Sequence, residues 1–206
     1  MLLEIDAKPS LRALSEAIAC DAAGHDRDGG FPAEAFARLV REGFVADPPV
    51  EPAEVRSLLL LLAAVGRGDL SVGRIFEGHV NAVYLIRQFG SAAQAAYYRR
   101  ITGGGGIFGV WNTDAPADPL CIVDGRFEGK KSFASGVDGL SHAIVTVGGD
   151  AGRQMLMVPT DPLGVDRGWW RPLGMRASGS HVADFTGLRV EPGWMLGRTD
   201  DYVRQP

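Results

Sequence analysis

Apolar residues in the first half of the chain recur every three or four positions, which is the spacing of one buried helix face. They are Leu11, Leu14 and Ile18, then Phe36, Leu39 and Val40, then the run from Leu58 to Val65, then Ile75, Val80, Val83 and Ile86. Glycine and proline punctuate this pattern. We expect Gly24 and Gly43 to end helices and Pro32 and Pro52 to begin them. The first half is therefore predicted to be helical.

The pattern changes at the segment TGGGG, residues 102–106. Just before it, Ser91 and Gln94 have the spacing of a capping box, which predicts a last helix reaching Ile101. After it, short apolar runs alternate with turn residues, as in antiparallel strands. Asp124-Gly125 is typical of a two-residue hairpin, and the turn GGDAGR at 148–153 separates the runs HAIVTV and QMLMV. HVADFTGLRV, residues 181–190, is predicted to form a further strand.

These patterns predict an α+β protein. An N-terminal all-helical domain is expected over residues 1–105, and an antiparallel β-barrel or sandwich domain over residues 106–196. Residues 197–206 are polar and are expected to form a stub without an element of their own.

Composition narrows the class of protein. The chain has 206 residues, 46% of them hydrophobic, and its net charge of −4 comes from acidic and basic residues mixed along the sequence. The sequence has no stripe of basic residues of the kind that predicts nucleic-acid binding. The apolar run from Leu58 to Val65 is far shorter than the roughly 20 residues of a membrane span. The N-terminus lacks a signal-peptide pattern, and Cys20 and Cys121 are far apart, so we expect a reduced, cytoplasmic setting.

Several familiar motifs are absent or out of context. Residues 104–109 match G-x-G-x-x-G, but a helix precedes them and a strand follows, so a hinge is the better interpretation. The four histidines have no metal-ligand spacing. Ser180 and His181 are adjacent and would face opposite sides of a strand, and no G-x-S-x-G elbow occurs, which argues against a hydrolase. Asp114, Asp118 and Asp138 lie near turns, where aspartate commonly bonds the backbone.

Two segments are unusual for strands that only fill a core. GVWNTDAPADP places Asn112 and Thr113 at the end of an apparent strand. GKKSFASG places Phe133 and Ser135 two residues apart, so we expect them on one face. An aromatic ring beside hydroxyl and amide groups suits a flat heteroaromatic ligand such as a flavin. The alternative is a plain β core with Phe133 inside and Ser135 in a turn, and the residues alone leave both open.

Five segments, in order, resemble the acyl-CoA dehydrogenase family. They are DRDGGFPAEAFARLVREGF, GHVNAVYLIRQFGSAAQAAYYRRITGG, VWNTDAP, GKKSFASG and PLGMRASGSHVADFTGLRV. The third is similar to the family's Thr-Glu-Pro segment, the fourth to its Lys-x-Trp-Ile-Thr-Asn-Gly segment, and the fifth to its Leu-Gly-Met-Arg-Ala-Thr-x-Ser segment. The fifth is the most specific match.

The resemblance implies FAD bound in an extended conformation against the β domain. By position, Thr113 would hydrogen-bond the pyrimidine edge of the flavin, and Asn112 would contribute nearby, mainly through its backbone. Phe133 would replace the family's tryptophan against the isoalloxazine, and Ser135 its threonine near the reactive ring nitrogen. The expected reaction is α,β-dehydrogenation of an acyl thioester by hydride transfer to the flavin.

Two departures qualify this expectation. The segment TDAPADP is shorter than the family's Gly-Ala-Gly-Ser-Asp stretch and lacks its serine, so the related flavin monooxygenases become an alternative. The family's C-terminal helical bundle, which supplies the catalytic base, would begin where this chain ends at Pro206. No residue of this chain is therefore nominated as the base. A separate chain supplying the bundle, or a homo-oligomer, is the expected partner, and the substrate is expected to be an acyl thioester or another small hydrophobic molecule. A non-catalytic interaction module without flavin is the third interpretation.

Overall fold

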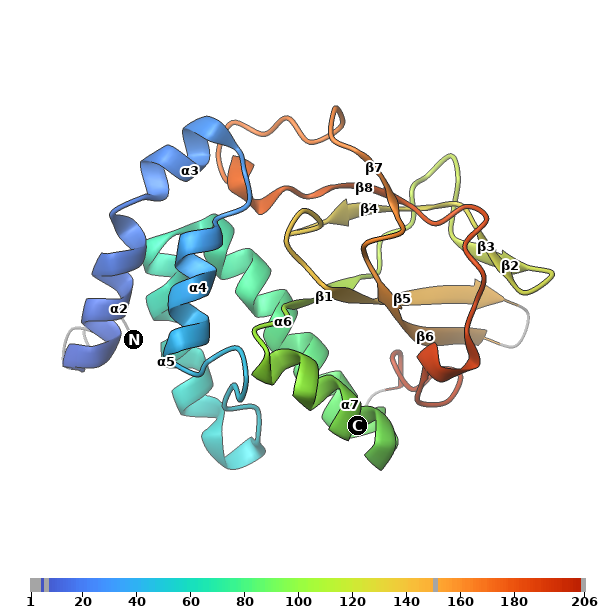
Figure 1. The fold of residues 1–206 in the computed structure, drawn as a ribbon, viewed down its shortest axis with the longest axis horizontal. Coiled ribbons are helices and arrows are strands. Elements are labelled where there is room, and N and C mark those ends of the chain that lie inside the picture. Colours follow the sequence, from blue (N-terminus) through green and yellow to red (C-terminus); the bar gives the residue numbers. More distant parts are fainter. Residues whose placement is uncertain (1–4, 6–7, 150–151, 205–206) are drawn as a thin grey trace.

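The structure is a computed structural model that describes residue 5, residues 8–149 and residues 152–204. Helices occupy the first half of the chain, as predicted, and lie beside the sheets of the second half (Figure 1). They are α2 (Pro9–Ala19), α3 (Ala22–Asp28), α4 (Ala33–Arg41), the short 3₁₀ turn η1 (Pro52–Glu54), α5 (Val55–Gly68), α6 (Leu70–Phe89) and α7 (Ala92–Gly103). Within the described residues, no helix combines the length and the apolar character that crossing a membrane requires.

The helices begin and end near the predicted positions, with two exceptions. Gly43 follows α4 with a φ of 80°, as expected of a helix stop. The stop predicted at Gly24 is wrong, because α3 runs through it and ends at Gly29, whose φ is 70°. Helix α6 begins earlier than its apolar stripe suggests, since the carboxylate of Asp69 accepts hydrogen bonds from the Ser71 and Val72 amides and caps it.

The capping box of α7 is confirmed. Ser91 Oγ accepts a hydrogen bond from the Gln94 amide at 3.2 Å, and the Gln94 side chain accepts one from the Ser91 amide at 3.0 Å. The Gln94 amide group also donates to the carbonyls of Gly193 and Met195, at 3.1 and 2.8 Å. One residue thus starts a helix and ties it to the end of the β region.

The second half forms three sheets, and the α+β class is confirmed. The strands are β1 (Phe108–Trp111), β2 (Cys121–Val123), β3 (Arg126–Glu128), β4 (Lys130–Ala134), β5 (His142–Gly149), β6 (Gly152–Pro159), β7 (Gly164–Asp166), β8 (His181–Asp184) and β9 (Met195–Leu196). Their order is β1-β5-β6-β9, β2-β3 and β4-β8-β7. The described strands close no barrel, so that alternative is wrong. All strand pairs are antiparallel except β1 with β5, which is parallel. A parallel pair needs a long crossover connection, and the segment that contains β2, β3 and β4 provides it.

Both predicted hairpins join neighbouring strands. Asp124 and Gly125 have φ values of 49° and 74° and connect β2 to β3, as the two-residue turn requires. Strands β5 and β6 pair as far as Gly149 opposite Gly152. Asp150 and Ala151, at the tip of the second predicted turn, lie outside the described residues.

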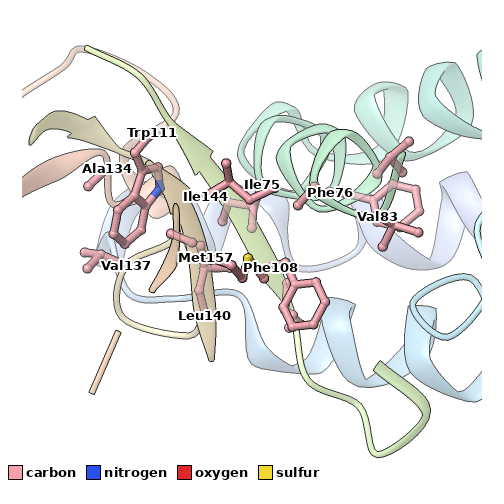
Figure 2. Packing of buried hydrophobic residues seen from close by; sticks show 14 of the residues in the cluster. Ile75, Phe76, Val83, Phe108, Trp111, Ala134, Val137, Leu140, Ile144 and Met157 are labelled. Carbon is pink, nitrogen blue, oxygen red and sulfur yellow. The ribbon is translucent and has the colours of Figure 1, made fainter. Parts of the chain in front are cut away.

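Helix α6 packs directly on β1 and joins the helices to the sheet. Phe76 and Phe108 are fully buried at this contact, among apolar side chains that Figure 2 shows between α6 and the strands. His79 lies in the same layer. Its Nε2 donates to the Val45 carbonyl at 2.9 Å, and its Nδ1 accepts from the Phe108 amide at 3.1 Å. Burial lowers the pKa of His79 to about 4, so the imidazole is neutral.

Candidate functional site

A cleft of about 370 Å³ opens where α6, the end of β1 and β4 meet. Its lining residues are Arg74, Glu77, Gly78, Asn81, Val110, Trp111, Asn112, Thr113, Phe133 and Tyr202, and we call it the α6–β1 cleft. Three of the four residues predicted to contact a cofactor are brought together here: Asn112 and Thr113 directly follow β1, and Phe133 lies in β4. The fourth, Ser135, is not part of the lining.

The backbone of β4 explains why Phe133 and Ser135 separate. Phe133 has a φ of 55°, and the pairing with β8 shifts register between Lys131 and Ala134. This left-handed residue interrupts the alternation of a regular strand. Phe133 is consequently 47% exposed, whereas Ser135 is 6% exposed. The expectation that they share a face is wrong, and so is the alternative that Phe133 fills a β core.

Ser135 belongs to a row of buried hydroxyl groups. Its Oγ lies 2.8 Å from Ser180 Oγ, which lies 2.9 Å from Ser178 Oγ. The Trp111 indole donates to the Ser135 carbonyl at 3.1 Å. Trp111 is also part of the cleft lining, so it links Ser135 to the cleft through one side chain. The contact of Ser135 with a flavin stays a prediction.

Strand β4 supports Asn112 and Thr113, the lining residues that form the floor of the cleft. The buried ammonium of Lys131 donates to the Asn112 carbonyl at 3.3 Å, the Asp114 carboxylate at 2.6 Å and the Thr146 carbonyl at 2.6 Å. The three donors of an ammonium are thereby used. Burial lowers the pKa of Lys131, and its bond to Asp114 opposes that effect. The Ser132 amide donates to the Thr113 carbonyl at 2.9 Å, so two successive floor carbonyls are bonded to β4.

These residues fit the edge and face of a flavin ring. Phe133 offers an exposed aromatic surface. The Asn112 side chain donates through Nδ2 to the Tyr202 hydroxyl, and its Oδ1 is buried without a hydrogen-bond partner among the described residues. A buried acceptor of this kind normally finds a donor, and a flavin has a ring N–H at its pyrimidine edge. The hydroxyl of Thr113 lies on the next residue of the same lining.

Sequence reasoning missed three parts of this site. Trp169 and Trp170 contact the Phe133 ring, with centroid distances of 4.9 and 6.2 Å. Adjacent tryptophans in a loop that also contains Gly and Pro were an available signal. The polar residues of α6, spaced three and four apart, formed a second one. Tyr202 lies in the segment expected to be a polar stub, and nothing in its local sequence indicates a site.

The serine and histidine at 180 and 181 have separate partners. Ser180 bonds the hydroxyls described above, whereas His181 Nε2 lies 3.6 Å from the Asp138 carboxylate. Asp138 also receives two hydrogen bonds from Arg167, at 2.9 and 2.6 Å. Burial lowers the pKa of His181, and Asp138 opposes the effect. The prediction that Ser180 and His181 do not act as a nucleophile and its base is in keeping with this geometry.

No protein-family model matches the sequence, and no curated protein matches it. By structure, the chain is similar to butyryl-CoA dehydrogenase from Megasphaera elsdenii, with a TM-score of 0.78 and 17% identity over 94% of this chain and 59% of that one. It is also similar to TdsC from Paenibacillus sp. A11-2, whose structure contains FMN and indole, with a TM-score of 0.74 and 21% identity over 94% of this chain and 53% of that one. A third similar structure is the methanesulfinate monooxygenase MsuC from Pseudomonas fluorescens, with a TM-score of 0.71 and 21% identity over 90% of this chain and 51% of that one.

These likenesses show that the helices and sheets have the acyl-CoA dehydrogenase fold, which the sequence segments predicted. The chain spans about half the length of the proteins it matches.

Proposed function

We propose that this chain is the flavin-binding portion of an oxidoreductase with the acyl-CoA dehydrogenase fold. The observation that carries the proposal is the α6–β1 cleft, whose lining brings together the half-exposed Phe133, Thr113 and Asn112. The buried Oδ1 of Asn112 has no hydrogen-bond partner among the described residues. A bound flavin supplies hydride or electron acceptance. Phe133 stacks on the ring, and Asn112 and Thr113 orient its pyrimidine edge. From β4, Lys131 bonds the Asn112 carbonyl and the Ser132 amide bonds the Thr113 carbonyl, which holds this backbone in place.

FAD is the flavin we propose, from the resemblance of the sequence segments. The neighbour TdsC was solved with FMN, so both flavins belong in the binding test. Ser135 is proposed to act near the reactive ring nitrogen, with Ser180 holding its hydroxyl. We also propose that a helical bundle, from this protein or a partner chain, covers the open side of the cleft, where it would protect the half-exposed Phe133.

α,β-Dehydrogenation of an acyl thioester is the reaction we propose first. It is the reaction of the family that the sequence resembles, and butyryl-CoA dehydrogenase is among the structural neighbours. Glu77 is the one carboxylate among the described lining residues, and both its oxygens accept hydrogen bonds, from Arg74 and Asn81. We assign it no role as a base, and we assign none to any other residue of this chain.

Flavin-dependent monooxygenation is the second candidate. The observation that favours it is the polar character of the α6 wall, where Arg74, Glu77 and Asn81 face the cleft. An acyl chain gains free energy by burying CH₂ groups against apolar side chains, and this wall offers few of them. MsuC, a methanesulfinate monooxygenase, has the same fold.

The proposal is tested by titrating the purified chain with FAD and with FMN while following flavin absorbance and fluorescence. We expect saturable binding with a perturbed visible spectrum. Phe133→Ala should weaken it about tenfold, the order expected for an aromatic stacking partner. The matched control is Tyr97→Ala, which removes a ring of the same 47% exposure on α7. Absence of binding for both flavins would refute the proposal and leave the non-catalytic module.

The reaction is distinguished with the loaded protein, together with any bundle-supplying partner. Anaerobic bleaching of the flavin by an acyl-CoA supports dehydrogenation. Resistance to every thioester, with oxygenation of a substrate by the chemically reduced protein once air is admitted, supports the monooxygenase instead.

A further inference from the structure

The α6 wall of the α6–β1 cleft carries an arginine that is held in a defined orientation. Arg74 Nη1 donates to one oxygen of Glu77, and Asn81 Nδ2 donates to the other, so Glu77 fixes both neighbours along one face of the helix. Residues at these spacings lie on the same side of an α-helix. All three belong to the cleft lining. The wall is therefore an organised polar surface.

The guanidinium of Arg74 lies near Gly78, on the helix that packs against β1. A Cβ placed on Gly78 would lie 3.7 Å from Arg74 Nη1 and 3.9 Å from both Gly109 Cα and the Val110 nitrogen. Gly78 is thus the point where α6 and β1 approach each other, and the Arg74 head group reaches to that point. The Arg74 side chain is 39% exposed, which leaves it accessible from the cleft.

Most of the hydrogen-bonding capacity of Arg74 is unused. A guanidinium has five N–H donors, and among the described residues the side chain has a single hydrogen bond, to Glu77. The remaining donors form a planar fork whose geometry matches a carboxylate. Asn81 donates through Nδ2 to Glu77, and among the described residues no hydrogen bond joins its Oδ1 to Arg74.

We propose that Arg74 recognises a carboxylate group on the substrate, so that this site takes a small carboxylate-bearing molecule. The inference rests on the proposed function in one respect, namely that the flavin ring occupies the Phe133 side of the cleft and leaves the α6 side to the substrate. The volume of about 370 Å³ lies at the lower end of the range for small-molecule sites. Glu77 and Asn81 are positioning residues for Arg74, and the carboxylate-bearing substrate is compatible with either reaction.

The test uses two probes of equal size, butyrate and butyramide, on the full chain. Backbone amide shifts of Gly78 and Thr113 in NMR spectra report occupancy of the cleft, with and without bound FAD. We expect butyrate to shift both resonances saturably and butyramide to bind at least about tenfold more weakly, because only the anion forms an ion pair with the guanidinium and offers two acceptor oxygens to its fork. Arg74→Gln should weaken butyrate binding by a factor of about ten to a hundred. The butyrate affinity of Arg74→Lys should lie between those of the unmodified protein and Arg74→Gln, since lysine keeps the charge but lacks the planar fork of donors.

The matched control is Arg12→Gln on α2, which removes an arginine in a similar helical ion pair, with Glu16, away from the cleft. It should leave butyrate binding unchanged. Equal binding of butyrate and butyramide, no shift with butyrate, or no effect of Arg74→Gln would overturn the inference. Flavin binding that persists in Arg74→Gln beside any of these results leaves the proposed function intact. Butyrate shifts that depend on Arg74 in a chain that binds no flavin would support the carboxylate site and refute the flavoprotein.

Discussion

At the scale of single residues, two side chains of β4 shape the site in opposite directions. Phe133 turns outward because its backbone is left-handed, with a φ of 55°. Lys131, two residues earlier, is fully buried and bonds three acceptors beneath the cleft. A positive φ outside glycine costs of the order of 1–3 kcal/mol and is retained at many binding sites. The strand therefore gives up local stability to present an aromatic surface.

Replacing Phe133 separates the backbone strain from the ring. Phe133→Gly should be more stable than Phe133→Ala by about 1 kcal/mol, because glycine adopts positive φ without a steric penalty. Both variants lose the ring and should bind flavin equally poorly. Urea unfolding of the flavin-free proteins measures the difference. A glycine variant less stable than the alanine variant would contradict the left-handed assignment.

Replacing Lys131 tests the support beneath the floor. Lys131→Met should lower the free energy of unfolding by about 3 kcal/mol, at the low end for breaking a buried pair because Asp114 keeps some solvent contact. The neighbouring Lys130 is the control. Its side chain is 37% exposed, and its ammonium pairs with Asp118 and Asp184 at 3.1 and 3.5 Å. Lys130→Met should cost much less than Lys131→Met, because an exposed ion pair contributes little to stability. Equal losses in urea unfolding would show that burial of Lys131 is not the cause.

At the scale of elements, the antiparallel pair α5 and α6 determines where the polar wall stands. Only Asp69 separates the two helices, and their backbones meet at Gly66 and Gly73. A Cβ on Gly73 would lie 2.8 Å from the Gly66 Cα. This close crossing sets the position of α6, and with it the position of Arg74 one residue further on.

The two glycines at this crossing are predicted to respond in opposite ways to alanine. Gly73→Ala should destabilise the protein by about 1–3 kcal/mol, because its methyl group meets helix backbone that cannot move aside. Gly66→Ala should stabilise it by up to about 1 kcal/mol, since its Cβ would meet no atom of the described residues within 4 Å apart from its own helix backbone, and alanine favours the helix. Thermal and urea unfolding of the two variants give the comparison. A stabilised Gly73→Ala would mean that the helices cross elsewhere.

At the scale of the whole molecule, the helices and the sheets are joined by buried polar contacts as well as by apolar packing. His79 on α6 bonds the loop after α4 and the first residue of β1 at once. The long segment between β7 and β8 passes back over the helices in Figure 1, where the Arg176 amide donates to Asp26 on α3 at 3.1 Å. The cleft depends on these contacts between helices and sheets, because the two walls of the cleft belong to different halves of the chain.

The contact that His79 makes between the helices and the sheet is predicted to weaken in mild acid. The pKa of His79 is lowered from 6.5 to about 4 in the folded protein, so the unfolded chain binds a proton first as the pH falls. The free energy of unfolding should therefore be unaffected by His79 above its unfolded pKa. Between that value and about 4 it should fall by at most about 1.4 kcal/mol per pH unit from this group.

Unfolding free energies across this pH range, with and without His79→Leu, isolate the contribution. The change in unfolding free energy per pH unit should be smaller in His79→Leu than in the unmodified protein. It should decrease less in His181→Leu, because Asp138 opposes the effect of burial on the pKa of His181. An unchanged slope in His79→Leu would contradict the neutral, buried imidazole.

The sequence by itself determined the features that depend on neighbouring residues. The helical first half follows from the three-and-four spacing of apolar residues, the start of α7 from the Ser91 and Gln94 pair, and the β2–β3 turn from Asp124-Gly125. Each is decided by hydrogen bonds and backbone preferences within a few residues. Asn112, Thr113 and Phe133 were predicted as site residues first from local pattern, as polar and aromatic groups that a β core would not need, and then from the resemblance of the segments.

Only the tertiary structure decided what those groups face. The parallel pairing of β1 with β5, the burial of Lys131 and the turning of Phe133 away from Ser135 each depend on contacts between distant segments. The α6 wall is the clearest case, since Arg74 looks like an ordinary exposed helix residue until β1 is packed beside it at Gly78. Local pattern sets which face of an element is polar, but the energy of packing between elements decides whether that face meets water or a ligand.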